Sequence, residues 1–177
     1  MLAPTRSDNL PPRKGTRPKT IRGPLHIQDS GFGDSKYLNQ FVDEILTWPH
    51  IESVAPSVSC PDTIRIRINQ RTITSDPAAF LTTREFARVL VVASTIYMAL
   101  PLVCAHWAIV RGWAEPHYLA SFGLMPAGAV VVYTPTDEQE LEVCYFLLAE
   151  SYRFACGLSI GDREVEHRAE IGKRYVG

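Results

Sequence analysis

The longest apolar stretch of the chain lies between Arg88 and Arg111, where twenty-two consecutive residues include no Asp, Glu, Lys or Arg. Its length would allow a membrane-spanning helix. The residues before Pro101, however, are rich in β-branched side chains, which favour strands, and the proline interrupts the run. The pattern therefore predicts a strand, a turn and a second strand. A helix over residues 102–110 follows, with Gly112 as its stop signal. We expect no membrane span.

An amphipathic helix is predicted upstream of this stretch. Ser35 is a favourable N-cap, and Trp48-Pro49 ends the pattern. The apolar positions between them recur at helical spacing: Leu38, Phe41, Val42, Ile45 and Leu46. Strands over residues 51–58 and 64–68 follow, and then a loop over residues 72–80.

The second of these strands alternates strictly. Ile64, Ile66 and Ile68 occupy one set of positions, and Arg65 and Arg67 occupy the other. Because side chains alternate between the two faces of a strand, the isoleucines are expected in the core and the arginines on the opposite face. Such arginines are usually solvated, although they could also bind an anionic group.

A second long helix is predicted near the C-terminus. Residues 129–133 (AVVVY) form an uninterrupted apolar strand, and the segment after it resembles a capping box, with Thr136 as the cap and Gln139 reaching back. The apolar stripe of this helix consists of Leu141, Cys144, Tyr145, Leu148 and Tyr152. Gly157 ends the helix.

The order of elements predicts an α+β fold. Short antiparallel strands punctuated by helices favour a two-layer sandwich, with the helices packed on one face of a mainly antiparallel sheet. Residues 31–157 are expected to form this domain. Residues 1–30, basic and rich in proline, are expected to be disordered, and residues 158–177 to form a polar C-terminal extension.

Composition narrows the classes of function. The 177 residues carry a net charge of −1, which gives no overall field to attract nucleic acid or an anionic membrane. The four cysteines have no metal-ligand spacing and are expected to be reduced core residues in the cytoplasm: Cys60, Cys104, Cys144 and Cys156. We expect the protein to bind neither a metal nor a cofactor. The expected partner is a hydrophobic small molecule, and a homodimer is possible.

His117 is the first candidate for chemistry. It follows a predicted helix end and lies two residues after Glu115, so the two side chains could act as an acid/base pair if both face one cavity. The alternative is a turn histidine that only bonds backbone. His106 lies inside an apolar helix, and His50 lies in a turn.

Several motifs resemble one family, the luciferase-like domain proteins of bacteria and fungi, named after a sponge protein. These are Trp48-Pro49-His50, residues 84–87 (REFA), 111–117 (RGWAEPH), 127–135 (AGAVVVYTP), 137–143 (DEQELEV) and 151–155 (SYRFA). The resemblance spans residues 35–157. A weaker similarity, in architecture alone, is to MmcQ/YjbR-type proteins.

The chain departs from the family at one group of positions. Members usually carry a His-x-His pair on the strand after the Glu-Phe-Ala motif and a further His or Asp on the returning strand, which implies a metal or acid/base cluster. Here those positions are Arg88, Leu90 and Tyr97, and only His117 remains. We interpret this as loss of the imidazole cluster with retention of an apolar pocket.

The resemblance and its departures suggest a cofactor-independent enzyme of secondary metabolism, a cyclase or isomerase acting on a hydrophobic small molecule. The reaction could be pericyclic, of Diels–Alder type. The expected catalytic residues are Arg88, Tyr97, His117 and Glu115, and the expected substrate-binding residues are Glu85, Leu90, Met98, Trp113 and Tyr133. Two alternatives stay open: an oxygen-dependent, luciferase-like oxidase and a non-catalytic small-molecule-binding protein.

Overall fold

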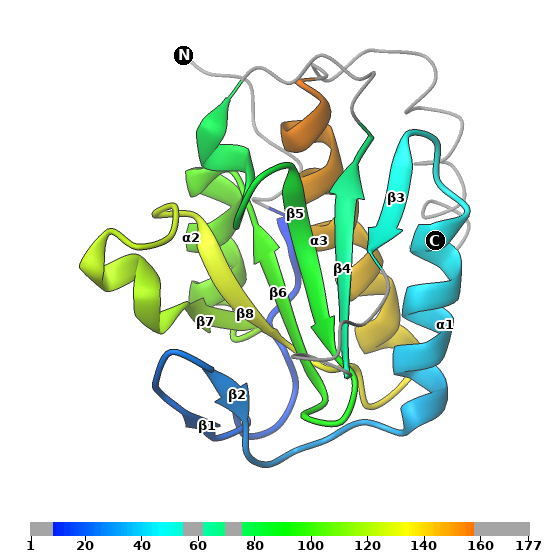
Figure 1. The fold of residues 1–177 in the computed structure, drawn as a ribbon. Coiled ribbons are helices and arrows are strands. Elements are labelled where there is room, and N and C mark those ends of the chain that lie inside the picture. Colours follow the sequence, from blue (N-terminus) through cyan, green and yellow to red (C-terminus); the bar gives the residue numbers. More distant parts are fainter. Residues whose placement is uncertain (1–8, 55–61, 70–75, 158–177) are drawn as a thin grey trace.

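A computed structural model describes residues 9–54, 62–69 and 76–157, and its main element is a six-stranded antiparallel sheet (Figure 1). Its strand order is β3-β4-β5-β6-β8-β7. The strands are β3 (Ile51–Val54), β4 (Thr63–Ile68), β5 (Glu85–Leu90), β6 (Thr95–Ala99), β7 (Ala114–Pro116) and β8 (Ala129–Tyr133). Each neighbouring pair is antiparallel.

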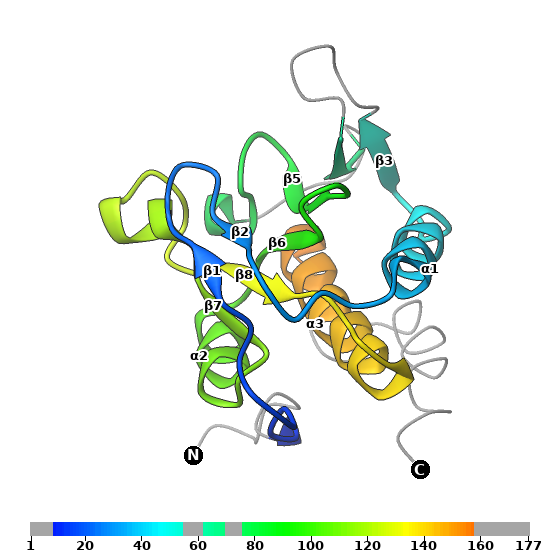
Figure 2. The ribbon, with the colours of Figure 1, turned by 90° about the horizontal axis from the view of Figure 1, so that it is seen from below.

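Three α-helices cover one face of this sheet: α1 (Ser35–Leu46), α2 (Leu102–Val110) and α3 (Glu138–Cys156). They lie behind the sheet in Figure 1 and on one side of it in the view from below (Figure 2). The prediction of an α+β two-layer sandwich with helices on one face is confirmed. The opposite face, which we call the open face, carries no α-helix of the described residues.

The register assigns side chains to the two faces. Ala87, Met98 and Val130 belong to the large core under the helices. The alternate positions, including Leu90, Tyr97 and Val131, form a smaller apolar cluster on the open face. A β-bulge in β5 leaves Phe86 as an extra residue, because Ile66 pairs with Ala87 and the next residue of β4, Arg67, pairs with Glu85. Phe86 consequently packs under the helices, where its ring contacts Tyr152 of α3.

The long apolar stretch forms β5, β6 and α2, as predicted. Pro101 is the N-cap of α2. The described residues contain no helix with the length and hydropathy needed to cross a membrane.

Two predicted caps are displaced by one residue. Asp34, and not Ser35, is the N-cap of α1, and its carboxylate accepts from the Lys36 N–H. Similarly, Asp137 caps α3 by accepting from the Glu140 N–H, and Glu140 reaches back to the Thr136 N–H. A carboxylate is favoured at both positions because the helix N-terminus carries partial positive charge.

The other differences lie in connections. The predicted loop over residues 72–80 contains a short 3₁₀ helix, η2 (Pro77–Ala79), capped by Asp76. The predicted strand over residues 51–58 ends at Val54 within the described residues, and residues 55–58 lie outside them, as do residues 72–75, Cys60 and residues 158–177. Cys104, Cys144 and Cys156 are buried free thiols.

The N-terminal segment departs most from expectation. Residues 9–30, expected to be disordered with the rest of the tail, lie against the domain and include the two-stranded sheet β1 (Thr20–Ile21) and β2 (Ile27–Gln28). This hairpin is attached to the open face (Figure 2), where the Gln28 N–H donates to Thr95 Oγ1 at 2.9 Å. Gln28 Oε1 in turn accepts from the Thr134 N–H. These contacts satisfy polar groups that a proline-rich chain cannot pair within itself.

Replacing the observed cap tests the assignment at α3. We expect Asp137→Ala to lower the free energy of unfolding by about 1 kcal/mol, because a backbone N–H at the helix start loses its acceptor. The matched control Gln139→Ala, in the same turn, should change it by less than about 0.5 kcal/mol. Urea unfolding measures both; a larger loss for Gln139→Ala would contradict the assignment.

Candidate functional site

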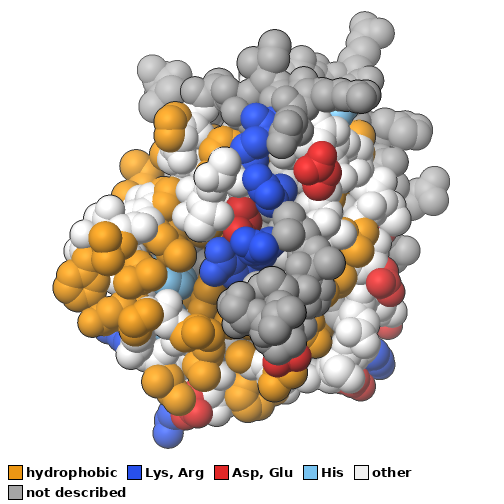
Figure 3. Space-filling view, viewed as in Figure 1, with side chains coloured by type: hydrophobic (Ala, Val, Ile, Leu, Met, Phe, Trp, Pro, Cys, Tyr) orange, Lys and Arg blue, Asp and Glu red, His pale blue; other side chains and the backbone are white. Residues whose placement is uncertain are grey.

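One row of side chains crosses the open face from β5 to β7. Arg88 lies opposite Tyr97, Tyr97 opposite Val131 and Val131 opposite Glu115. His117 follows β7, and its N–H donates to the Ala129 carbonyl of β8. The structure thus brings the four predicted catalytic residues, separated by up to 29 positions in the sequence, onto one face. In Figure 3 this face shows Lys and Arg side chains beside an apolar area.

Tyr97 and His117 are in direct contact at the centre of this row. Their ring centroids lie 4.6 Å apart with an interplanar angle of 86°. Tyr97 is 2% exposed and His117 is fully buried. Tyr97 Oη and His117 Nε2 are two of three buried side-chain polar atoms without a hydrogen-bond partner among the described residues. Buried polar atoms are rarely left unpaired, so the contacting rings of Tyr97 and His117 are the candidate functional site.

The hydrogen bond at Nδ1 of His117 determines the tautomer of its imidazole ring. Nδ1 accepts from the Leu119 N–H at 3.2 Å and caps the 3₁₀ helix η3 (Tyr118–Phe122). An accepting nitrogen carries no proton, so a neutral imidazole must carry its hydrogen on Nε2. Burial, and secondarily the nearby His26 and Arg88, lower the pKa of His117 to about 4. At neutral pH the unpaired Nε2 is therefore a neutral N–H donor.

Tyr97 is a second neutral donor. Burial raises the pKa of its hydroxyl to about 12, against smaller opposing effects of Arg88 and of the His26 backbone. The hydroxyl stays protonated at neutral pH, and no acceptor of normal geometry takes its hydrogen in the described chain. Tyr97 and His117 together present two uncharged donors that lack an acceptor.

Arg88 lies beside these donors and is partly held by Glu85. Its Nε donates to Glu85 Oε1 at 2.5 Å, and Thr82 Oγ1 donates to the other carboxylate oxygen at 2.8 Å. Glu85 is 1% exposed, so this buried carboxylate is neutralised by Arg88. The terminal nitrogens of Arg88 have no hydrogen bond within the described residues.

Glu115 does not contact His117 as a direct acid/base pair. Its carboxylate is held by His26 Nε2 at 2.5 Å, by Thr20 Oγ1 at 2.5 Å and by the Tyr133 hydroxyl at 3.2 Å. His26, which contacts Glu115, is also near His117, and the two ring centroids lie 5.6 Å apart. Glu115 is therefore fully engaged in anchoring the N-terminal hairpin.

His26 is the functional-site residue that the sequence did not reveal. It is fully buried, and its Nδ1 accepts from the Tyr118 N–H, so two imidazoles cap the start of η3. Burial lowers the pKa of His26, although Glu115 opposes this. No local motif distinguishes His26 in a segment rich in proline and basic residues; only its long-range contacts do.

The predicted substrate-binding residues divide between the two faces. Glu85 and Leu90 lie on the open face near Tyr97, and Tyr133 lies there beside Glu115. Met98 and Trp113 belong to the core under the helices, and the Trp113 indole donates to the Pro11 carbonyl. Met98 follows Tyr97 directly in a strand, so its side chain points to the other face. Met98 and Trp113 are therefore not part of the site.

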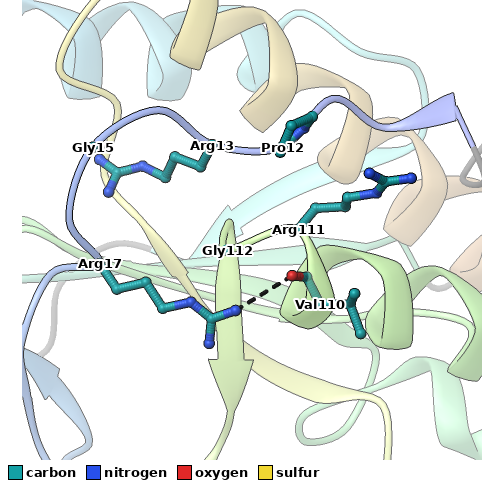
Figure 4. Close-up of a pocket in the computed structure, with 7 residues that line it drawn as sticks. All are labelled: Pro12, Arg13, Gly15, Arg17, Val110, Arg111 and Gly112. Carbon is teal, nitrogen blue, oxygen red and sulfur yellow. Dashed lines mark hydrogen bonds between the residues drawn. The ribbon is translucent and has the colours of Figure 1, made fainter.

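A separate hollow of about 240 Å³ lies at the end of α2 and is lined by three arginines (Figure 4). Their guanidinium groups point apart. Arg13 pairs with Glu140, Arg17 donates to the Ile109 carbonyl at 2.6 Å, and Arg111 stacks on Trp107. These contacts give the arginines structural roles, although Arg111 Nε is the third buried polar atom without a hydrogen-bond partner among the described residues.

The fold and the site together define an α+β protein with a buried polar cluster on the helix-free face of an antiparallel sheet. Residues 83–151 match the family model described as Luciferase domain. The match confirms the family resemblance over a segment that runs from β5 into α3 and includes Arg88, Tyr97 and His117. No curated protein and no solved structure gave a significant match.

The described residues contain no group of three or more His, Cys, Asp or Glu side chains with the geometry to hold a metal ion. At the positions where the resemblance led us to expect histidines, the described structure places Arg88 and Tyr97 opposite each other and Leu90 in the adjoining apolar cluster.

The depressed pKa of His117 predicts a pH dependence of stability. The unfolded chain binds a proton near pH 6.5 and the folded chain only near pH 4. Stability should therefore fall as the pH drops through this window, by about 3 kcal/mol at pH 4 from His117 alone. Urea unfolding at several pH values measures this. His117→Asn, whose side-chain oxygen can still accept from Leu119, should flatten the slope, and an unchanged slope would contradict the prediction.

Proposed function

We propose that the protein is a cofactor-independent cyclase or isomerase of secondary metabolism that acts on a hydrophobic small molecule. The proposal rests mainly on the two neutral, buried donors that lack an acceptor, Tyr97 Oη and His117 Nε2. Cytoplasmic location and homodimer formation stay predictions.

Two such donors suit a carbonyl oxygen of the substrate. Preorganised donors stabilise negative charge that develops on this oxygen in a transition state, and they do so most effectively where water is excluded. Withdrawal of electron density by the carbonyl activates a conjugated double bond toward ring closure or bond migration. In such a reaction the bonds rearrange within one molecule, so the product is an isomer of the substrate and no co-reactant is consumed.

The surroundings of the donors suit an apolar substrate. Tyr97 belongs to a cluster with Leu81, Leu90 and Val131, and Met125 packs against it. Apolar contact of this kind binds a substrate without adding polar groups that compete for the donors.

Polarisation of a carbonyl is better supported than proton abstraction. A general base needs an unprotonated atom directed at the substrate, whereas His117 uses its unprotonated Nδ1 to cap η3. Glu115 is occupied by His26, Thr20 and Tyr133. In place of a proton-transfer pair, we therefore assign His117 the role of a hydrogen-bond donor to the substrate. Glu115 has the role of anchoring the N-terminal hairpin.

Untargeted mass spectrometry tests the proposal. Purified full-length protein, pretreated with a chelator, is incubated with small molecules extracted from the source cells. We expect one compound to be replaced by another of identical exact mass and different retention time. Conversion only after metal is restored, or a product heavier by oxygen atoms, would overturn the proposal in favour of an oxidase. Binding without any conversion would favour a carrier.

Tyr97→Phe separates a functional hydroxyl from a structural one. We expect the conversion rate to fall about 10- to 100-fold, because one carbonyl donor is lost. The same substitution should leave the free energy of unfolding unchanged or raise it by about 1 kcal/mol, because a buried hydroxyl without a partner destabilises the fold. The control is Tyr133→Phe, which should lower stability by about 1 kcal/mol because its hydroxyl bonds Glu115. Loss of stability in Tyr97→Phe with full turnover would contradict the assignment.

A further inference from the structure

Two arginines face each other at the edge of the proposed site. Arg65 of β4 lies directly opposite Arg88 of β5, and Arg88 lies opposite Tyr97 of β6, so the three side chains form a row on the open face. Like charges directly opposite each other on neighbouring strands are destabilising. The run of Lys and Arg side chains in Figure 3 lies on this face. Because Arg65 and Arg88 repel each other, their placement on neighbouring strands is not explained by stability of the sheet.

The nearby carboxylates do not neutralise this pair completely. Glu85 binds Arg88 through Nε, and Glu52 lies opposite the third arginine of the face, Arg67. Arg65 has no ion pair or hydrogen bond in the described structure. The three arginines and two carboxylates leave one positive charge uncompensated, that of Arg65 beside Arg88.

We propose that Arg65 and Arg88 bind the carboxylate of an apolar carboxylic acid, which is the substrate class of the site. This inference deepens the proposed function and rests on it. A monoanion matches the single uncompensated charge, and guanidinium groups bind carboxylates through paired, charge-assisted hydrogen bonds. The terminal nitrogens of Arg88 provide the donors on the Tyr97 side.

The row also sets how the acid lies. Its apolar body contacts Leu90 and Val131, the open-face neighbours of Arg88 and Tyr97. Neighbouring strands are about 4.8 Å apart, so Arg65 and Tyr97, which lie on either side of Arg88, are on strands roughly 10 Å apart. The substrate therefore carries two oxygen functions: an anionic one at the arginines and a carbonyl at the neutral donors.

Binding of a matched pair of probes tests this inference. 4-Phenylbutyrate and the uncharged 4-phenylbutyramide have nearly the same shape, and their binding to the full chain is followed by NMR through the arginine Nε–H signals. We expect saturable binding of the carboxylate at least tenfold tighter than that of the amide, and weakened by salt. Equal affinities, or no saturable binding of the carboxylate, would overturn the inference.

Arg65→Gln should remove the preference for the carboxylate, with about a tenfold loss of affinity. Arg67→Gln is the matched control, since it removes the same charge from the same face of the same strand but lies beside Glu52 and Glu85. It should change affinity less than threefold. Equal losses in the two variants would show a general charge effect and overturn the specific site.

The outcomes separate this inference from the proposed function. If isomer formation depends on Tyr97 but the two probes bind equally, the carboxylate site is wrong and the proposed function stands. If the carboxylate binds through Arg65 but no isomer forms with any extracted compound, the proposed function is wrong, and the acid is cargo of a carrier and not a substrate.

Discussion

The hydrogen bond from the Leu119 N–H to His117 Nδ1 is the constraint on which the site depends. It caps a 3₁₀ helix, and it also forces the neutral imidazole to carry its proton on Nε2. Burial then keeps the ring neutral and leaves that N–H without an acceptor. His117 is therefore a structural cap at Nδ1 and, in our proposal, a donor to the ligand at Nε2. A histidine that bonds the backbone of a turn can thus also be a functional-site residue.

The N-terminal hairpin extends this constraint into a buried network. His26 repeats the arrangement of His117, with Nδ1 accepting from the neighbouring Tyr118 N–H, but its Nε2 is satisfied by Glu115. This contrast separates the two imidazoles: His26 is fully paired and anchors the hairpin, whereas His117 retains an unpaired donor next to Tyr97. The buried, paired groups of His26 and Glu115 fix the geometry of the site. The unpaired donors of His117 and Tyr97 are the groups that we propose bind the substrate.

Much of the fold follows from local patterns, whereas the site depends on pairing. Alternation and turn signals predicted the strands around Tyr97 and the helices behind them. The same alternation excludes Met98 from the face that holds Tyr97. Phe86 could not be assigned, because it is the extra residue of a bulge that breaks the alternation of β5. His26 could not be found either, since its order arises from contacts with Glu115, 89 positions away.

The central claim is that His117 presents an N–H at Nε2 with no acceptor. Long-range ¹H–¹⁵N NMR of the imidazole nitrogens of the full-length protein at pH 7 measures this directly. The account predicts a neutral ring protonated on Nε2, with Nδ1 shifted as an unprotonated acceptor, and a change of the Nε2 signal when an apolar carbonyl compound binds. A ring protonated on Nδ1, or one charged at pH 7, would contradict it.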